Sequence, residues 1–164
     1  MNKNIISLEG VSLNQEERLI FDNINLSIKE GDFVYLVGET GSGKSSLVKS
    51  LYAEIKVSAG NISVSDYNLN KIQHREIPSL RRKLGIVFQD FQLLQDRTVY
   101  ENLAFVLNAT GWNNKTEISN RINEVLESVH LEGFDQKMPY ELSGGEQQRA
   151  AIARALLNKP EVIL

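Results

Sequence analysis

One glycine-rich segment constrains this chain more than any other. Residues 38–45 read Gly-Glu-Thr-Gly-Ser-Gly-Lys-Ser and match the pattern G-x-x-x-x-G-K-[ST] at every constrained position. An apolar, strand-like run, Phe33–Val37, comes directly before the loop, and a helix is expected from Lys44 to about Ala53. A strand, a glycine loop and a helix in this order predict an α/β fold built around the loop.

The residue types in this loop suit the binding of phosphate groups. Glycines let successive backbone N–H groups turn toward one anion, and the following helix adds the positive end of its dipole. Lys44 supplies a mobile positive charge for β- and γ-phosphates, and the Ser45 hydroxyl is suited to a bridging Mg²⁺. The alternative, a glycine turn that binds nothing, is disfavoured by the flanking strand and helix.

Composition narrows the class of protein. The chain has 164 residues, enough for about one domain. It contains no cysteine, which excludes disulfides, thiolate nucleophiles and cysteine-based metal sites. A formal net charge of -3 gives no reason to expect nucleic acid as a partner. No run approaches the about 20 apolar residues of a membrane span, so we expect a soluble protein that meets a membrane only through a partner.

Strand patterns come first in the chain and helical patterns later. Strands are expected at Ile5–Val11, Ile24–Ile28, Asn61–Val64 and Gly85–Phe88, and a helical turn at Pro78–Lys83. From Leu93 to Tyr140 the pattern is helical: Thr98 is suited to cap a helix, and apolar residues from Ile118 to Val129 repeat on one helical face. We therefore expect a helical insert between two strands of an α/β core.

The C-terminal residues have the pattern of a buried strand. Glu161–Leu164 follow Pro160 and are mostly apolar and partly β-branched. Because tolerated ends of domains are exposed, a chain that stops inside a core strand is expected to be part of a longer domain. The alternative is a frayed apolar tail.

A second glycine-containing motif, Leu142–Arg149, stands at the start of a predicted helix. Ser143 suits the N-cap position and Glu146 follows three residues later, as in a capping box. An ordinary helix start therefore explains part of the motif. Two consecutive glycines exceed what a cap needs, however, and the N–H groups of a helix start would form a second anion site.

Together these motifs resemble those of the ATP-binding cassette (ABC) family of ATPases. Leu142–Arg149 resembles the signature motif of the family, and Val87–Asp90 resembles its Q-loop, with Gln89 at the glutamine position. The glycine loop precedes the signature motif at the spacing typical of the family. Arg75–Leu94 and Asp96–Leu103 are similar to the cell-division branch, while lipoprotein-release and macrolide-export ATPases share part of this pattern.

The resemblance implies a fold and a division into domains. The fold is that of a P-loop NTPase, with a RecA-like core that is incomplete here, an N-terminal antiparallel β subdomain and an α-helical insert. Residues 1–92 and 141–164 would form the core and β subdomain, and residues 93–140 the helical subdomain. Residues 1–164 would then be the N-terminal part of one ABC ATPase domain.

The resemblance also implies ATP and Mg²⁺ as cofactors. Lys44 and Gln89 would be catalytic, with Lys44 on the phosphates and Gln89 near the Mg²⁺ and the attacking water; Ser45 and Gln89 would contact the metal. Ser143 and Gly145 would contact the γ-phosphate held by the opposite subunit, giving a nucleotide-dependent homodimer. The expected nucleotide-binding residues are Gly38, Glu39, Thr40, Gly41, Ser42, Gly43, Lys44, Ser45, Ser46, Ser143, Gly144 and Gly145.

Two departures from the family pattern affect these expectations. Val11–Glu17 contains no aromatic residue to stack on adenine, and Phe21, the nearest one, is expected in the core. The family's Mg²⁺-orienting Asp, its Glu that acts on water and its switch His follow a strand like Val162–Leu164 and are not among these residues. His74 and His130 lie elsewhere, so we expect these 164 residues alone to hydrolyse ATP negligibly.

The function implied is that of an ATP-binding subunit at the cytoplasmic face of the inner membrane. Its partner would be an integral membrane protein, an FtsX-like permease, docked near Gln89–Tyr100 and the helical insert. One alternative is the energy module of a lipoprotein, lipid or drug exporter. Others are a nucleotide switch that never hydrolyses and a soluble P-loop protein of DNA repair or translation, which the short insert and acidic charge disfavour.

Overall fold

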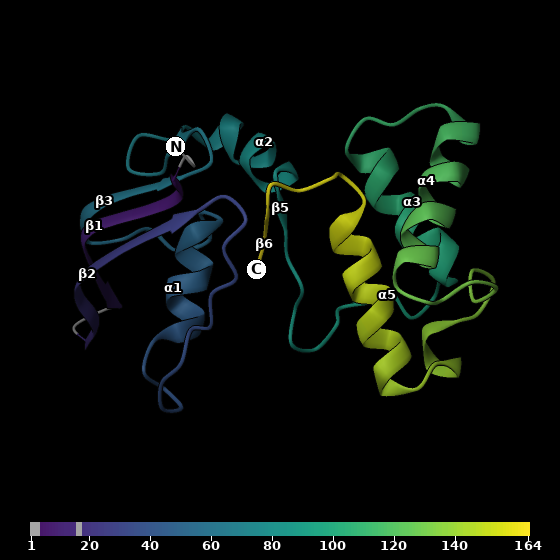
Figure 1. Ribbon diagram of the computed structural model, residues 1–164, viewed down its shortest axis with the longest axis horizontal. Helices are drawn as coiled ribbons and strands as arrows, with labels where there is room; N and C mark the ends of the chain where they lie inside the picture. Colours follow the sequence, from purple (N-terminus) through teal and green to yellow (C-terminus); the bar gives the residue numbers. More distant parts are fainter. Residues whose placement is uncertain (1–3, 16–17) are drawn as a thin grey trace. The chain divides into compact units, whose positions relative to one another are not determined.

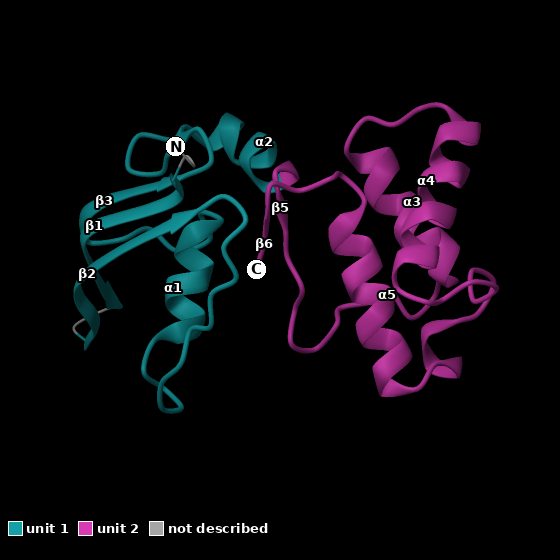
Figure 2. Ribbon diagram, in the orientation of Figure 1, with its two compact units in different colours: residues 1–81 teal, residues 82–164 magenta. Residues whose placement is uncertain are grey.

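The computed structural model describes residues 4–15 and 18–164. They form two compact units, one within residues 1–81 and one within residues 82–164 (Figure 2). The first unit contains a β-sheet and the glycine loop, and the second contains three longer helices. The predicted division into residues 1–92 with 141–164 and residues 93–140 stays a prediction.

The sheet of the first unit has four strands (Figure 1). Its order is β2-β1-β3-β4, and every neighbouring pair is antiparallel. The strands are β1 (Asn4–Gln15), β2 (Arg18–Lys29), β3 (Ala59–Val64) and β4 (Tyr67–Asn68). The expected N-terminal antiparallel β subdomain is therefore confirmed.

A bulge in β1 keeps its apolar residues on the core face. Ile6 and Leu8 are buried, and after the bulge Val11 and Leu13 are buried instead. The register against β2 shifts between Leu8 and Val11, where Gly10 has a φ of 60°. Because side chains alternate along a strand, the extra residue moves the buried set from even to odd positions.

Three helical elements complete the first unit: α1 (Lys44–Leu51), the 3₁₀ turn η1 (His74–Glu76) and α2 (Ile77–Arg82). Helix α1 begins at the predicted residue and ends two residues before Ala53. Leu47 and Leu51 are its buried apolar residues.

The predicted strand Phe33–Val37 is wrong. The segment has no strand conformation, and the exposed fractions of Phe33, Tyr35 and Val37 are 82%, 80% and 86%. A strand needs a neighbour whose N–H and C=O groups complete its ladder. Among residues 4–15 and 18–164, no strand pairs with this segment, so its composition alone was a misleading signal.

The second unit is mainly helical. Its helices are α3 (Val99–Ala109), α4 (Lys115–Ser128) and α5 (Gly144–Leu156), with the 3₁₀ turn η2 (Pro139–Glu141) before α5. Two short strands, β5 (Leu84–Gly85) and β6 (Val162–Ile163), pair in parallel. The C-terminal residues thus form the expected strand at Val162–Ile163, but it is not buried as predicted, because the exposed fraction of Ile163 is 55%. Strand β5 ends earlier than the predicted Gly85–Phe88.

The helices of this unit surround one apolar core. Leu103 and Leu107 of α3 and Ile122 and Leu126 of α4 are buried in it, together with Ala150 and Ala153 of α5. Thr98 caps α3 as predicted: its side chain accepts from the Glu101 N–H, and the Glu101 carboxylate accepts from the Thr98 N–H. The amphipathic pattern and the cap therefore both correctly predicted these helices.

Candidate nucleotide-binding site

The glycine loop ends in a helix start that carries no side-chain cap. Gly43 stands at the N-cap of α1 with φ 89° and ψ 6°, in the left-handed region. The first turn of α1 contains no Asp or Glu. The N–H groups and the positive dipole end of α1 therefore remain suited to an external anion.

Gly43 also packs closely against β2. A Cβ atom on Gly43 would lie 2.7 Å from Ile20 Cγ2 and 3.3 Å from Phe21 Cδ1. Phe21 is half-buried, so it is only partly in the core as expected. The left-handed backbone and the close β2 side chains both require glycine at this position.

Lys44 folds back onto the loop that precedes it. Its ammonium donates to the carbonyl oxygens of Gly38 at 2.8 Å and Glu39 at 2.6 Å, and lies 3.5 Å from Ser42 Oγ. The charge is thus held over the loop, in which the Ser42 N–H donates to the Glu39 carbonyl at 3.2 Å, while Ser45 is exposed beside it. This donor set fits the phosphates of a nucleotide with Mg²⁺ on the Ser45 hydroxyl.

Gln89 lies in an exposed turn between β5 and α3. In this turn the Phe91 N–H donates to the Phe88 carbonyl at 3.1 Å, and the Gln92 N–H to the Asp90 carbonyl at 2.6 Å. Phe91 and Gln92 both have positive φ angles, 57° and 48°. Left-handed φ angles at two successive non-glycine residues are unusual, and surrounding contacts must stabilise this backbone conformation.

Two side chains from helices hold the segment that contains Gln89. Arg154 of α5 donates to the carbonyls of Phe91 at 2.7 Å and Gln92 at 2.5 Å. Burial lowers the pKa of Arg154, and the Asp90 carboxylate opposes this shift. Asn102 of α3, which is buried, exchanges two hydrogen bonds with the Leu94 backbone.

The signature motif begins α5 with a complete capping box. The Ser143 hydroxyl donates to Glu146 Oε2 at 2.7 Å and accepts from the Glu146 N–H at 3.4 Å. The Ser143 N–H donates to the same carboxylate oxygen at 2.7 Å. The hydroxyl and backbone bonds from Ser143 lower the pKa of Glu146. Ser143, Gly144 and Gly145 are all exposed.

The predicted residues therefore fall into three groups. Residues 38–46 come together in the first unit, while Gln89 and residues 143–145 lie in the second. Of the segment Val11–Glu17, where adenine stacking was in question, residues 16 and 17 lie outside the described residues. The roles assigned to these residues stay predictions.

Sequence reasoning missed Arg154 and Asn102. Asn102 lies on the buried face of α3 with Val99 and Leu103. A polar residue on a buried face indicates a side chain with hydrogen-bond partners, so the sequence pattern could have identified it. Arg154 lies between two alanines of α5, which gives no such signal. Its partners are 62 and 63 residues away in sequence.

Comparison with known proteins decides the family. A family model described as "ABC transporter" matches residues 21–164. The chain belongs to the ABC transporter family. This confirms the resemblance drawn from the glycine loop, the Gln89 segment and the signature motif. None of the helices in the described part of this ABC chain combines the length and apolar character needed to cross a bilayer.

The relatives include cell-division ATP-binding proteins named FtsE. The chain is 47% identical to FtsE of Streptococcus pneumoniae over 141 residues, which cover 86% of this chain and 61% of that relative. It is 49% identical to FtsE of Mycobacterium tuberculosis over 148 residues, covering 90% of this chain and 64% of the relative. The chain thus spans less than two thirds of the length of these curated relatives.

Solved ABC structures share the fold. The dimeric structure of MJ0796, titled a bacterial ABC transporter cassette, matches with a TM-score of 0.87 and 37% identity, over 96% of this chain and 72% of that one. CbiO1 from Clostridium perfringens matches with a TM-score of 0.89 and 29% identity, over 99% and 64%. The predicted P-loop NTPase fold with an antiparallel β subdomain and helical insert is therefore confirmed.

Proposed function

We propose that this chain is the nucleotide-binding part of an FtsE-like ABC ATPase that binds ATP with Mg²⁺ at residues 38–46. The observation that carries this proposal is the start of α1, where the Gly43 backbone and the Lys44 ammonium form an uncapped, positively charged anion site. A solved relative of this fold is titled as bound to ADP and Pi, at a TM-score of 0.85 and 36% identity, over 96% of this chain and 72% of that one.

Lys44 is the residue that moves on binding. Its ammonium donates to two carbonyl oxygens of its own loop. Phosphate oxygens carry full negative charge and form stronger, charge-assisted bonds. Lys44 would therefore exchange neutral acceptors for phosphate oxygens, Ser45 would hold the Mg²⁺ that neutralises the remaining charge, and Gln89 would orient the attacking water.

A homodimer would bring the signature motif to the nucleotide of the opposite subunit. The exposure of Ser143, Gly144 and Gly145 supports this role, as does the dimeric form of the MJ0796 relative. The Ser143 hydroxyl is engaged by Glu146. A phosphate oxygen would therefore replace the Glu146 carboxylate as its acceptor, which makes this contact weaker than that of Lys44.

The partner in the native complex would be an integral membrane protein of the FtsX-like permease type, at the cytoplasmic face of the inner membrane. The exposed apolar side chains of Leu94 and Phe105, beside the charged loop at 95–97, support docking there. Arg97 lies over the Phe105 ring at 4.8 Å. Capture of the permease that is lost in Arg97→Glu, with folding intact, would support this docking; unchanged capture would contradict it.

Equilibrium binding tests the core of the proposal. Calorimetric titration of the chain with ATP and Mg²⁺ should give one site per chain, weakened by EDTA and by Lys44→Ala. Competition with GTP then measures base selectivity, which is expected to be low because Val11–Glu17 contains no aromatic residue to stack on adenine. An affinity that is unchanged in Lys44→Ala would contradict the assignment of the site.

Hydrolysis is a separate test. We expect the 164 residues on their own to bind ATP but to release phosphate negligibly, because they contain neither the acidic pair nor the switch histidine of the family. The native gene product is expected to hydrolyse ATP. Turnover by the 164-residue polypeptide that disappears in Lys44→Ala would overturn this expectation.

A further inference from the structure

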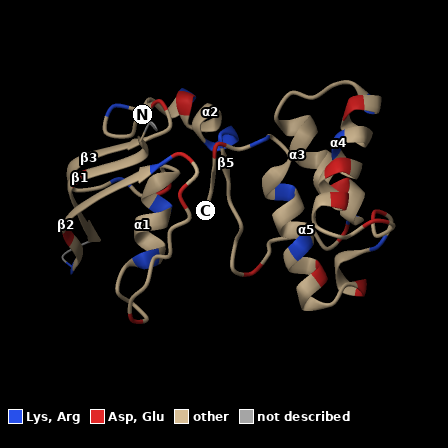
Figure 3. Ribbon diagram, in the orientation of Figure 1, with Lys and Arg blue, Asp and Glu red and all other residues tan. Residues whose placement is uncertain are grey.

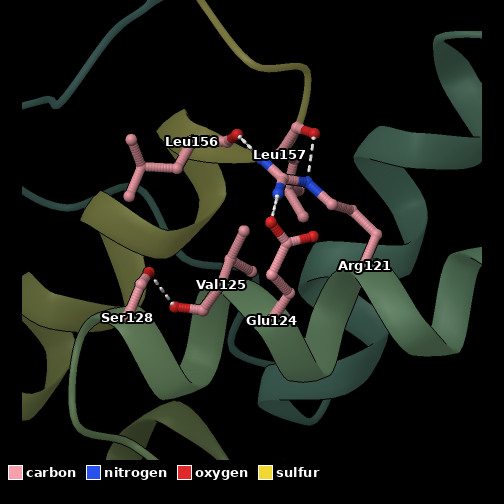
Figure 4. Close-up of polar contacts among 6 residues, drawn as sticks. All are labelled: Arg121, Glu124, Val125, Ser128, Leu156 and Leu157. Carbon is pink, nitrogen blue, oxygen red and sulfur yellow. Dashed lines mark hydrogen bonds and ion pairs between the residues drawn. The ribbon is translucent and has the colours of Figure 1, made fainter.

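Two arginines of the second unit make the same kind of contact in different places. Arg121 of α4 donates to the carbonyls of Leu157 at 2.9 Å and Leu156 at 2.5 Å, and pairs with Glu124 (Figure 4). Arg154 of α5 donates to the carbonyls of Phe91 and Gln92. Arg121 therefore secures the end of a helix, whereas Arg154 secures the turn that carries Gln89.

The turn at Phe91 and Gln92 requires such a contact. Both residues have left-handed backbones, which cost free energy in non-glycine residues and persist only where neighbours hold them. Their two carbonyls meet one guanidinium, whose planar, forked N–H groups suit two acceptors at once. A lysine ammonium on the same helix position would lack that fork.

The rest of the loop is held independently. The Asn102 side chain donates to the carbonyls of Leu94, Arg97 and Thr98, at 3.0, 3.1 and 3.0 Å. Asn102 thus secures the C-terminal part of the loop on α3, while Arg154 secures the part next to Gln89 on α5. Loss of Arg154 would release the turn at Gln89 without releasing the whole loop.

We infer that Arg154 is a positioning residue for Gln89: it ties the turn at Phe91 and Gln92 to the helix that the signature motif begins. This role rests on the proposed function, because it matters only if Gln89 takes part in nucleotide hydrolysis. Helix α5 runs from Gly144 to Leu156, so Ser143 and the turn at Gln89 are joined to one rigid element. Engagement of Ser143 by a nucleotide and placement of Gln89 are then linked.

The test compares Arg154→Lys with Arg121→Lys in the native gene product. Both changes keep the charge and the long side chain and remove the guanidinium fork. In Arg154→Lys, hydrogen exchange of the Phe91 and Gln92 amides should rise by about tenfold or more. In Arg121→Lys these two amides should exchange as in the wild type, even where overall stability falls.

Kinetics separate positioning from structural support. Arg154→Lys should lower kcat by about tenfold with KM and ATP affinity changed less than about twofold, because a displaced catalytic group affects the reaction more than binding. Arg121→Lys should keep kcat within about twofold. In a Gln89→Ala background, Arg154→Lys should cause no further loss, since its effect acts through Gln89.

Three results with the variants would overturn the inference. These are wild-type kcat in Arg154→Lys, an equal loss of kcat in Arg121→Lys, or a full additional loss when Arg154→Lys is combined with Gln89→Ala. A wild-type protein that binds ATP but releases no phosphate would overturn the proposed hydrolysis and this role with it. A normal wild type with unaffected Arg154→Lys turnover would overturn the positioning role alone.

Discussion

The starts of α1 and α5 look alike in sequence and differ in structure. Glycine and serine residues stand at the start of each helix. Helix α1 begins with Lys44 after Gly43, which provides no side-chain cap, whereas α5 begins with Gly144 after Ser143, which caps it in a capping box with Glu146. Figure 3 shows the difference as a basic residue at the start of α1 and an acidic residue near the start of α5. A glycine-rich helix start is therefore suited to bind an anion only when no side chain of the same protein caps the N–H groups of its first turn.

This difference indicates that the two motifs have different roles in binding phosphate. The α1 start has no side-chain cap, and the Lys44 ammonium beside it donates only to neutral carbonyl oxygens, so we propose that it binds phosphate by itself. At the start of α5, the Ser143 N–H and hydroxyl both donate to the Glu146 carboxylate. We propose that the α5 start adds contacts to a phosphate that is held elsewhere, and alone it is expected to bind none.

The largest expected effect comes from removing the charge at α1. Lys44→Ala should weaken ATP binding by about 100-fold, or about 2.7 kcal/mol, because the phosphates lose a charged hydrogen-bond donor. Isothermal titration measures this loss. The matched control is Lys49→Ala on the same helix, whose ammonium pairs with Glu54 at 2.9 Å and should leave ATP affinity unchanged.

The second test exchanges glycine for alanine at both helix starts. Gly43→Ala should destabilise the first unit by about 1–3 kcal/mol, because its φ of 89° and the close Ile20 side chain both oppose a Cβ. Gly144→Ala should change stability by less than about 0.5 kcal/mol, since a Cβ there meets no described atom within 4 Å. Urea unfolding followed by circular dichroism measures both.

Equal losses of stability in the two variants would contradict the comparison, because a Cβ atom would then be equally unfavourable at Gly43 and Gly144. A stable Gly43→Ala with normal ATP affinity would likewise remove the reason for glycine at the α1 start.

The features that sequence predicted well are local. The N-cap at Thr98 and the capping box at Ser143 each depend on residues within one helical turn, so a short pattern contains all the partners. The face of α4 repeats at helical spacing and packs as predicted.

The features that sequence missed depend on distant partners. Phe33–Val37 has the composition of a strand, but a strand exists only where another strand pairs with it. Arg154 contacts carbonyls more than 60 residues away, and carbonyl groups occur at every position of the chain. A side chain that binds a backbone carbonyl therefore leaves no recognisable partner in the sequence.

Ser143→Ala tests the cap at α5. Losing the hydroxyl should destabilise the second unit by about 1 kcal/mol, as is usual for an N-cap serine. Fluorescence of Trp112, the chain's one tryptophan, which packs against the helical core, reports unfolding of this unit. The matched control is Ser45→Ala in the first turn of α1, which should leave the second unit's stability unchanged. An equally stable Ser143→Ala would mean that the α5 start is as open as that of α1.

The smallest expected effect is a pH dependence confined to α5. Bonds from the Ser143 hydroxyl and N–H lower the pKa of Glu146 below its unfolded value of about 4.3. The resulting stabilisation is present above the unfolded pKa and is lost as pH falls through the lower, folded pKa. NMR titration should therefore give a Glu146 midpoint below about 4.3 that returns toward this value in Ser143→Ala.

First-turn amides of α5 should exchange faster as Glu146 protonates, while those of α1, which has no such carboxylate, should not. An unshifted midpoint would show that Glu146 does not hold the α5 start closed, and the contrast between the two helices would then depend on Lys44 alone.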